Sequence, residues 1–512
     1  MNRIMKNKIK FLTVIGFMSA AGIVQSCTNL DENVYDKIKA QDYGSTQEQI
    51  DALIGPLYQQ MGEYYGKFAD LNSATDEMVV PTRGGDWKDG DKWLRLETHA
   101  WDQTLDDGIF NGIWTWCYGQ TAAINAQLDN PLVTNAETRA GIRALRAWYH
   151  YIALDNFGNA PIILESTNPN GGSSSEGVAQ RTSKELYDFV ESELLAAMPD
   201  LSTEARGEHY GRMNQWVAHA ILAKLYLNAE VYTGTPQWEK AIEHCTAIME
   251  SGNYALNADF FQNFVAKNDL STEIILATPM DKTARPGFNF QYATLHYAHQ
   301  QTYDLGNSPW NGYSAATEFY NTFDDADVRK KMWLIGQQYD IDGKPLKDDT
   351  RDMVLVAEID SFAYSAGPNG RLKGARFNKY EIQLHNHTSD NSQDNDVVLF
   401  RLADIIMMRG EAKWRNGDKQ GGVDDFNQIR ALRNVPAYTI ATLTEDEMLA
   451  ERGRELAFEF HRRQDQIRFG TWNNQTDVPG VTTNTDPKRS LYPIPQTQIT
   501  LNPNLVQNDA YK

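Results

Sequence analysis

Cysteine is scarce in this sequence: the 512 residues contain only three, at positions 27, 117 and 245. So few thiols exclude a fold held together by a network of disulfides. Cys117 and Cys245 both lie in segments with helical apolar spacing, so we expect two separate buried thiols rather than a disulfide. Long apolar runs are also rare, and the N-terminal run from Phe11 to Val24 is too short to predict a membrane span.

Positive charge is in short supply as well. The chain has 48 Lys and Arg residues against 68 Asp and Glu residues, for a net charge of −20. An acidic protein is repelled by phosphate backbones and anionic lipid surfaces, so nucleic acid is not expected as a partner. The charge is compatible with neutral or cationic ligands.

The sequence carries none of the common enzyme motifs: no P-loop, no G-x-G-x-x-G, no H-E-x-x-H and no G-x-S-x-G. His385 and His387 stand close together in a polar segment, but one H-x-H predicts no metal site. The stretch "DIDGKPLKDD" lacks the ligand spacing of an EF-hand and is better explained as a hairpin turn. We therefore predict no catalytic residue, no cofactor and no metal site, although so many acidic residues neither identify nor exclude a glycosidase pair.

The N-terminus is typical of an exported protein. Arg3, Lys6, Lys8 and Lys10 precede the apolar stretch, as in a secretory signal. The following "VQSC" resembles a bacterial lipobox, which predicts cleavage before Cys27 and lipid attachment to its thiol. Loss of the signal would change the net charge from −20 to −24.

Helical periodicity dominates much of the chain. Two consecutive segments, "NQWVAHAILAKLYLNAEVY" and "PQWEKAIEHCTAIMESGNYAL", read as a helix, a short turn and a second helix, and resemble a tetratricopeptide unit. The segment "TEDEMLAERGRELAFEFHRRQDQIRFG" predicts one amphipathic helix with Thr444 and Glu447 as a capping box and ion pairs Glu451/Arg454 and Glu459/Arg463. We interpret that helix as structural. Another helix, "SKELYDFVESELLAAMPDL", has Ser183 as its expected N-cap.

Between residues 255 and 396 the helical pattern gives way to turn signals and short mixed segments, which predict hairpins and long loops. The stretch "NPNGGSSSEG" predicts a flexible insertion. The chain therefore reads as a helical scaffold with a loop-rich lobe, and loops on rigid scaffolds commonly carry binding.

Five segments in order along the chain resemble the SusD/RagB family of outer-membrane lipoproteins of Bacteroidetes: "SCTNLDE", "RALRAWYHYIALDNFGNAPII", "LFRLADIIMMRGEAKWRNG", "ERGRELAFEFHRRQDQIRFG" and "LYPIPQTQITLNPNLVQNDAYK". Phe460 stands where glycine is common in the family. The resemblance implies a mostly α, SusD-like fold with four degenerate tetratricopeptide-like helical pairs and a loop-rich lobe with short strands. The domains it implies are a signal peptide (1–26), a lipidated tether (27–45) and one SusD-like domain (46–512), divided into a helical scaffold (46–254 and 397–470), a variable lobe (255–396) and a C-terminal segment (471–512).

The resemblance also implies a function without catalysis. The protein would capture oligosaccharides or polysaccharides at the cell surface, anchored to the outer membrane by lipid, and deliver them to a SusC-like TonB-dependent transporter. RagB-like members are thought to import peptides, so an acidic groove for basic peptides is an alternative. A surface glycoside hydrolase is a second alternative, which would require two carboxylates about 5–10 Å apart in a cleft.

The family's ligand-contacting residues follow no fixed motif, so the site has to be predicted from residue chemistry. An exposed aromatic ring covers the weakly apolar face of a sugar, while Asp, Asn, Arg and Gln satisfy its hydroxyls. Two polar, glycine-containing loops place tryptophan where no core is expected: "PTRGGDWKDGDKW" and "GNSPWNGYS". From them we predict a glycan site made of Trp87, Trp310, Asp86, Arg83, Trp93 and Tyr313.

Overall fold

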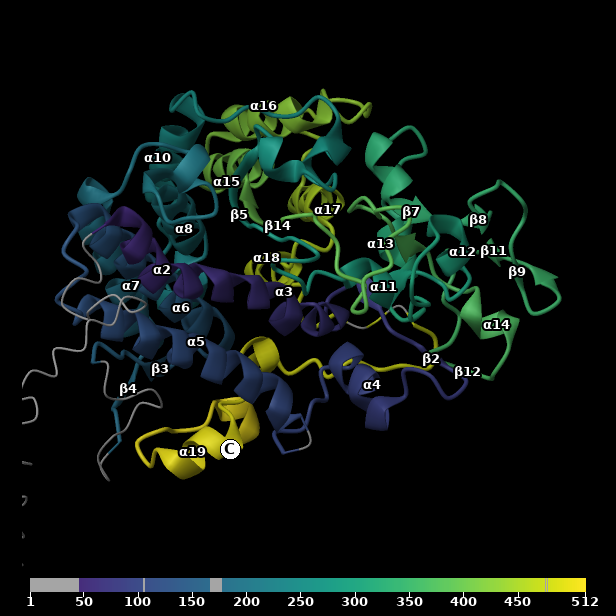
Figure 1. The fold of residues 1–512 in the computed structure, drawn as a ribbon, viewed down its shortest axis with the longest axis horizontal. Helices are drawn as coiled ribbons and strands as arrows, with labels where there is room; N and C mark the ends of the chain where they lie inside the picture. The colour runs from purple at the N-terminus through teal and green to yellow at the C-terminus, as the bar shows by residue number, and fades with distance from the viewer. Residues whose placement is uncertain (1–45, 105, 166–176, 475, 477) are drawn as a thin grey trace, which may run out of the picture. The chain divides into compact units, whose positions relative to one another are not determined.

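The fold was analysed in a computed structural model that describes residues 46–104, 106–165, 177–474, 476 and 478–512 (Figure 1). The predicted signal peptide, Cys27, the tether and nearly all of "NPNGGSSSEG" lie outside these residues. Residues 50–512 form one compact unit, separate from residues 1–49. None of the described helices is both long and apolar enough to cross a membrane.

Long helices that pack against their neighbours along the chain build the scaffold (Figure 1). The first group is α5, α6 and α7, and the second is α8, α10, α15 and α16, with α10 packed on α15. Their bounds are α5 (Asp107–Leu128), α6 (Ala136–Phe157), α7 (Ser183–Ala197), α8 (Gln215–Leu227), α10 (Trp238–Glu250), α15 (Leu402–Arg415) and α16 (Lys419–Arg430). The other helices are α2 (Gln47–Gln59), α3 (Glu63–Phe68), α4 (Lys92–Glu97), α9 (Ala229–Thr233), α11 (Phe290–Thr294), α12 (His299–Tyr303), α13 (Thr317–Asn321), α14 (Pro368–Arg371), α17 (Glu445–Leu456), α18 (Arg462–Arg468) and α19 (Gln496–Leu501).

Side chains at the helix starts explain where several helices begin. The Asn135 amide oxygen accepts from the Thr138 backbone N–H at 2.9 Å and caps α6. In α7 the capping box is formed by Thr182 and Glu185, one residue earlier than the expected Ser183. Thr444 caps α17 by accepting from the Glu447 backbone N–H at 3.2 Å, but the Glu447 carboxylate accepts from Tyr438 and Arg454, so only half of the predicted capping box forms.

The strands are short, and in the described part of the chain every sheet has two strands. The longest pair, β5 (Ile274–Thr278) with β14 (Val397–Arg401), is buried beside α15. A parallel pair, β2 (Thr82–Arg83) with β12 (Ala363–Tyr364), joins the N-terminal part of the chain to the lobe at the right of Figure 1. The other pairs are β1 (Met78–Val79) with β6 (Ser314–Ala315), β3 (Ala160–Pro161) with β4 (Gln180–Arg181), β7 (Trp333–Leu334) with β13 (Arg376–Phe377), β8 (Gly336–Gln337) with β11 (Val354–Leu355), and β9 (Lys347–Asp348) with β10 (Arg351–Asp352).

The segment predicted as one amphipathic helix is two helices with a sharp break between them. Helix α17 ends at Leu456 and α18 begins at Arg462, because Phe458 and Phe460 adopt φ angles of 58° and 64°. One continuous helix would also have placed Leu449, Leu456, Phe460 and Ile467 on a shared apolar face, and the break makes that prediction from the sequence wrong. Of the two predicted ion pairs, Glu451/Arg454 is present at 2.7 Å, whereas Glu459 binds Arg401 and Lys379, and Arg463 binds Asp155.

Helix α17 carries carboxylates into the interior. The side chain of Glu455 is fully buried and accepts from three buried guanidinium groups. Those groups come from distant segments, listed with their N–O distances: Arg329 (3.0 Å), Arg401 (2.9 Å) and Arg433 (2.9 Å). The network ties α17 to the lobe, to β14 and to the end of α16.

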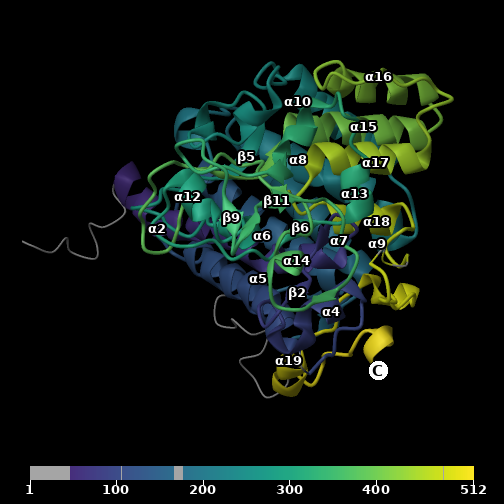
Figure 2. The same cartoon turned by 90° about the vertical axis from the view of Figure 1, so that its right-hand side faces the viewer.

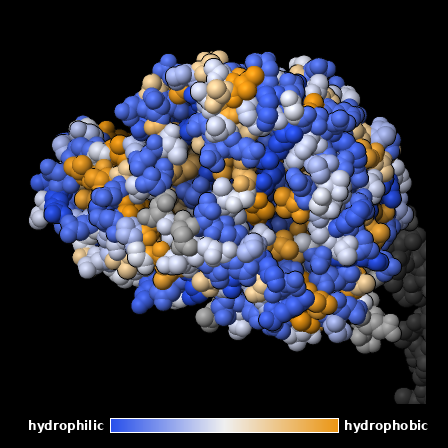
Figure 3. Space-filling model, turned by 180° about the vertical axis from the view of Figure 1, so that it is seen from behind, coloured by the Kyte–Doolittle hydropathy of each residue, from blue (hydrophilic) through white to orange (hydrophobic). Residues whose placement is uncertain are grey.

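The core contains the cysteines and several tryptophans of the helical segments, and the surface is mostly polar. Cys117 and Cys245 are both buried and free, which confirms the expectation of separate thiols. Of the tryptophans in the helical segments, Trp114, Trp116 and Trp148 are buried in the core, whereas Trp216 and Trp238 are half-buried. The face shown in Figure 3 is mostly hydrophilic, with apolar side chains in small scattered groups.

Candidate functional site

The two tryptophan loops predicted from the sequence meet in the structure. The indole N–H of Trp87 donates to the backbone carbonyl of Trp310 at 2.7 Å, across 223 residues of sequence. The Trp87 ring lies directly against Gly312, where an added Cβ would come within 2.2 Å of the ring. A glycine is therefore needed for this contact. One loop follows β2 and the other precedes β6, so the β1–β6 and β2–β12 pairs bring them to one place.

The loop that carries Trp310 is fixed by the turn around α11. The backbone N–H groups of Trp310 and Gly312 donate to the carbonyls of Tyr292 and Ala293, each at 2.7 Å. With its backbone held, the Trp310 side chain is 41% exposed. Trp87 is half-buried and has a φ of 61°. Strain of this kind in a non-glycine residue costs about 1–3 kcal/mol and is concentrated at functional sites.

Trp93 and Tyr313 lie beneath this pair. Both are buried, and their ring centroids lie 5.3 Å and 5.6 Å from that of Trp87. The Trp93 indole donates to Asp89 at 2.7 Å, and the Tyr313 hydroxyl donates to Asp70 at 2.5 Å. Burial raises the pKa of Tyr313 well above its ordinary value. These side chains thus support Trp87 from below, whereas the sequence prediction placed them at the ligand surface.

Arg83 also differs from its predicted position. Its guanidinium is buried and donates to the Asn311 carbonyl (3.1 Å), the Ser314 hydroxyl (2.7 Å) and the Lys373 carbonyl (3.0 Å). Burial lowers the pKa of Arg83 to about 10. These three contacts hold the lobe to β2, so Arg83 fixes the loop geometry and its guanidinium does not face solvent. The polar composition of the loop did not indicate that the Arg83 guanidinium would be buried.

Asp86 lies at the surface next to Trp87, together with a residue that the sequence prediction missed. The hydroxyl of Tyr297 donates to the Asp86 carboxylate at 2.5 Å. Burial, and then this carboxylate, raise the pKa of Tyr297 to about 12. Tyr297 lies in the stretch "LHYAHQ", whose pattern is typical of a buried helix. No turn signal in that stretch indicates that Tyr297 is at the surface. The surface platform thus consists of Trp87, Trp310, Tyr297 and Asp86.

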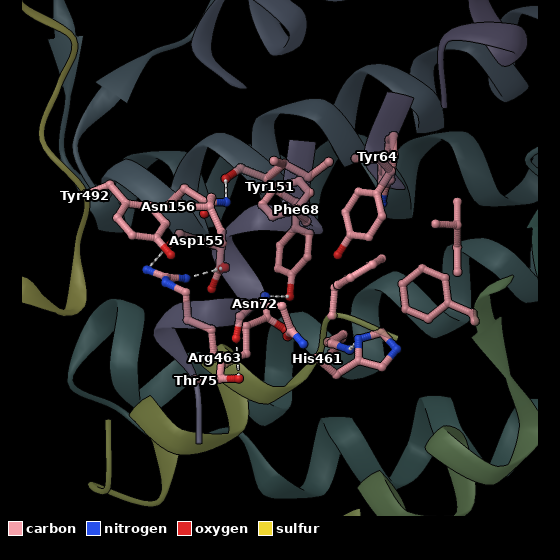
Figure 4. Close-up of a pocket in the computed structure, with 18 residues that line it drawn as sticks. Tyr64, Phe68, Asn72, Thr75, Tyr151, Asp155, Asn156, His461, Arg463 and Tyr492 are labelled. Carbon is pink, nitrogen blue, oxygen red and sulfur yellow. Dashed lines mark hydrogen bonds and ion pairs between the residues drawn. The ribbon is translucent and has the colours of Figure 1, made fainter. Parts of the chain in front are cut away.

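A separate small cavity lies between α3, α6 and α18 (Figure 4). Its volume is about 50 Å³, and its lining includes Tyr64, Trp148 and Phe460. The Asp155–Arg463 ion pair, with an N–O distance of 2.8 Å, forms part of its wall. Since one water needs roughly 10–15 Å³ by this measure, the cavity has room for a few water molecules and is too small for a sugar ring.

The histidine pair noted in the sequence lies beside one carboxylate. His385 and His387 both lie near the Asp304 carboxylate, at 2.7 Å and 3.4 Å, in exposed loops. Within the residues that the structure describes, no group of three or more His, Cys, Asp and Glu side chains is arranged to hold a metal ion.

Comparison with protein families and curated proteins gives matches along most of the chain. Residues 232–511 match the SusD family, and residues 29–227 match a family described as "Starch-binding associating with outer membrane". The starch-binding protein SusD of Bacteroides thetaiotaomicron is 30% identical over 424 residues, which is 74% of each chain. A SusD-like protein of Bacteroides ovatus is 22% identical over 492 residues, covering 91% of this chain and 83% of the relative.

Comparison with solved structures gives the same fold. A SusD-like protein of Bacteroides fragilis superposes with a TM-score of 0.73 at 18% identity, over 92% of this chain and 98% of the other. The surface glycan-binding protein A of Bacteroides thetaiotaomicron, solved with laminarihexaose, gives a TM-score of 0.72 at 19% identity, over 90% and 99%. The chain is therefore similar to these proteins in fold: mostly helical, with short strands.

Proposed function

The chain belongs to the SusD family, whose members bind ligands without catalysis, and on that premise we propose that it binds a glycan at the surface platform. In this proposal Trp87 and Trp310 cover the C–H faces of sugar rings. Asp86 accepts from sugar hydroxyls, and the Tyr297 hydroxyl fixes the orientation of its carboxylate.

The observation that carries the proposal is the fixed pairing of Trp87 with Trp310. The indole hydrogen bond and the contact with Gly312 hold the Trp87 side chain in place before any ligand arrives. Groups fixed in the binding geometry lose little conformational freedom on association, so a platform of this kind favours binding. Buried Trp93 and Tyr313 add to the rigidity because they pack under Trp87.

The relatives suggest which glycans to test first. The curated relative from Bacteroides thetaiotaomicron is named for starch binding, and one structural neighbour was solved with laminarihexaose. We therefore propose a neutral glucan as the ligand class, with starch and laminarin as the first probes.

We also propose the role that the family implies in uptake. The protein would be held at the outer membrane by lipid on Cys27 and would pass its ligand to a SusC-like TonB-dependent transporter. In this view the four helical pairs are a tetratricopeptide-like scaffold for that partner. Co-purification of such a transporter with the lipidated protein supports the pairing, and isolation of the protein alone from its own membrane contradicts it.

The glycan proposal is tested by affinity electrophoresis of residues 28–512 in gels containing starch, laminarin or other polysaccharides of a broad panel. We expect at least one polysaccharide to retard the protein. Trp87→Ala and Trp310→Ala should each weaken retardation about tenfold or more, since truncation of a tryptophan that anchors a binding surface typically costs roughly 2 kcal/mol or more. Trp216→Ala is the matched control, because Trp216 is a half-buried tryptophan of the helical scaffold.

The control variant should retain wild-type retardation, and all three variants should keep the wild-type melting temperature within a few degrees. Retardation that survives both platform substitutions would assign the glycan to another surface. The absence of retardation by every polysaccharide would overturn the proposed function.

A further inference from the structure

A second, larger depression lies beside the platform on the same lobe. Its volume is about 740 Å³, within the roughly 300–1,000 Å³ of small-molecule sites. It opens to solvent and is lined by β10, by the turn after Ile359, by β12 and by the loop that contains α14. Its polar lining residues include Asp349, Thr350, Arg351, Asp360, Ser361, Tyr364, Ser365, Asn369 and Lys373.

The depression and the platform are joined by one stretch of backbone. The Gly84 N–H donates to the carbonyl of Tyr364 at 2.9 Å, next to the parallel β2–β12 pair. At Gly84 an added Cβ would come within 3.0 Å of the Ala366 Cα, so the backbone segments around Gly84 and Ala366 are in close contact. Two residues later the same chain reaches Asp86 and Trp87. Ala366 lines the depression, so the loop that carries Trp87 passes directly beside it; Figure 2 shows β2 next to α14.

The charges that line the depression are balanced, and three of the four form ion pairs: Asp349 with Arg371, and Asp360 with Lys373. Asp349 and Asp360 carry negative charge, and Arg351 and Lys373 carry positive charge. The Asp360 carboxylate accepts from the Tyr364 hydroxyl at 2.8 Å and from the Lys373 ammonium at 2.7 Å. The Arg351 guanidinium donates to the Asn369 side-chain oxygen.

This pairing favours one class of ligand. An ionic ligand would have to compete with the partners of Asp349, Asp360 and Lys373, whereas a hydroxyl can donate to and accept from such groups without breaking their ion pairs. Arg351 and Asn369 are exposed, so both can add a hydrogen bond to a ligand. Charged and hydroxyl groups that alternate around an open, neutral depression suit an uncharged polyhydroxylated chain.

We propose that this depression is an extension subsite that binds the sugar units next to those stacked on Trp87 and Trp310. The inference rests on the proposed function and deepens it: the ligand is an uncharged oligosaccharide chain long enough to reach from the platform past Gly84 to Arg351. Affinity then grows with chain length, because the longer fragments occupy both places.

The test is isothermal titration of residues 28–512 with fragments of two to seven sugar units, prepared from the polysaccharide that retards the protein. We expect the heptasaccharide to bind at least tenfold more tightly than the disaccharide. In the Arg351→Ala/Asn369→Ala variant the heptasaccharide should lose about fivefold to tenfold in affinity, while disaccharide binding stays unchanged. The matched control is Asp342→Ala/Lys344→Ala, an exposed ion pair of the same lobe that lies outside the depression.

The outcomes separate the two proposals. If affinity does not rise with length, or if the Arg351/Asn369 variant keeps the full rise, the extension subsite is refuted while the platform stands. If Trp87→Ala abolishes binding of every fragment and the Arg351/Asn369 variant removes only the gain with length, both proposals are supported. If the control variant loses the same affinity, the loss does not belong to the depression. If no polysaccharide retards the wild type, the proposed function fails and the subsite fails with it.

Discussion

Phe460 is a single residue whose backbone and side chain have opposing effects on stability. Its φ of 64° lies in the left-handed region, which costs a non-glycine residue about 1 kcal/mol or more. Its ring, however, packs against Tyr64 and Phe290 and lines the small cavity. The resemblance to the SusD/RagB family placed glycine at this position, and the positive φ is the physical reason that glycine suits it.

Substitution of Phe460 should therefore invert the usual order of alanine and glycine. Phe460→Ala loses the ring and keeps the backbone strain, whereas Phe460→Gly loses the ring and relieves it. We expect both variants to be less stable than wild type, with glycine the more stable of the two by about 1 kcal/mol in urea unfolding.

Phe189 provides the control for that order. It is a half-buried phenylalanine within helix α7, where glycine should be about 1 kcal/mol less stable than alanine. If the alanine variant is more stable than the glycine variant at both Phe460 and Phe189, the proposed backbone strain at Phe460 is contradicted.

The sequence was informative about single residues where a large apolar side chain occurs in a polar loop that has no core to bury it. Tryptophans in polar, glycine-rich loops marked Trp87 and Trp310, and both loops do meet at the surface. The same reasoning could not distinguish the surface rings from Trp93 and Tyr313, which pack beneath Trp87. Both of these residues lie in the same loops and are buried by contacts that the local sequence does not show. Tyr297 was missed because its neighbours have a helical, apolar pattern.

At the scale of elements, α17 illustrates how far a helical pattern can mislead. Alternating glutamate and arginine residues are typical of a solvated helix face, yet the carboxylates of Glu451 and Glu455 are fully buried. The cations that neutralise Glu455 come from Arg329, Arg401 and Arg433, far away in sequence. Burial of this face is a property of the tertiary fold, and no local pattern encodes it.

The network predicts a large effect from a small chemical change. Glu455→Gln keeps the size of the side chain but removes the charge that faces three buried guanidinium groups. Burial of unpaired charge is costly, so we expect a loss of about 3–5 kcal/mol in the free energy of unfolding, measured by urea denaturation.

Glu445→Gln in the first turn of the same helix is the matched control. Glu445 is exposed, so its substitution should change stability by less than about 1 kcal/mol. Equal effects of the two substitutions would show that the buried network contributes nothing beyond an ordinary helix charge.

Short strands were the least predictable elements. Turn signals between residues 255 and 396 indicated loops and hairpins, and the structure has several two-residue strands there. Their partners could not be inferred, because a parallel pair such as β2–β12 joins segments whose local sequences carry no sign of each other. The long helices were recognised because their apolar spacing persists over several turns.

At the scale of the whole molecule, position in the cell depends on the N-terminus. If the lipid on Cys27 is the anchor, Cys27→Ser should move the full-length protein from the membrane fraction to the soluble fraction of its native host. One acyl chain gives marginal membrane binding and several give stable anchoring, so the shift should be nearly complete. Immunoblotting of the fractions measures it, and continued membrane association of the variant would contradict the lipid anchor.

The family and its helical fold could be inferred from the sequence because five separated segments resemble the family in the correct order. The proposed binding surface could be inferred only in part. Its rings come from stretches 223 residues apart, and their meeting depends on strand pairs and on one glycine.

The origin of the platform in two remote stretches also bears on how sugar preference can diversify among relatives. Trp87 comes from the N-terminal part of the chain, whereas Trp310 and Tyr297 come from the variable lobe. Recombination that exchanged only the lobe would import half of a recognition surface and leave the other half behind. New preferences should therefore arise by coordinated point changes on both sides of the Trp87–Gly312 contact, and a lobe chimera should bind neither parent's glycan well.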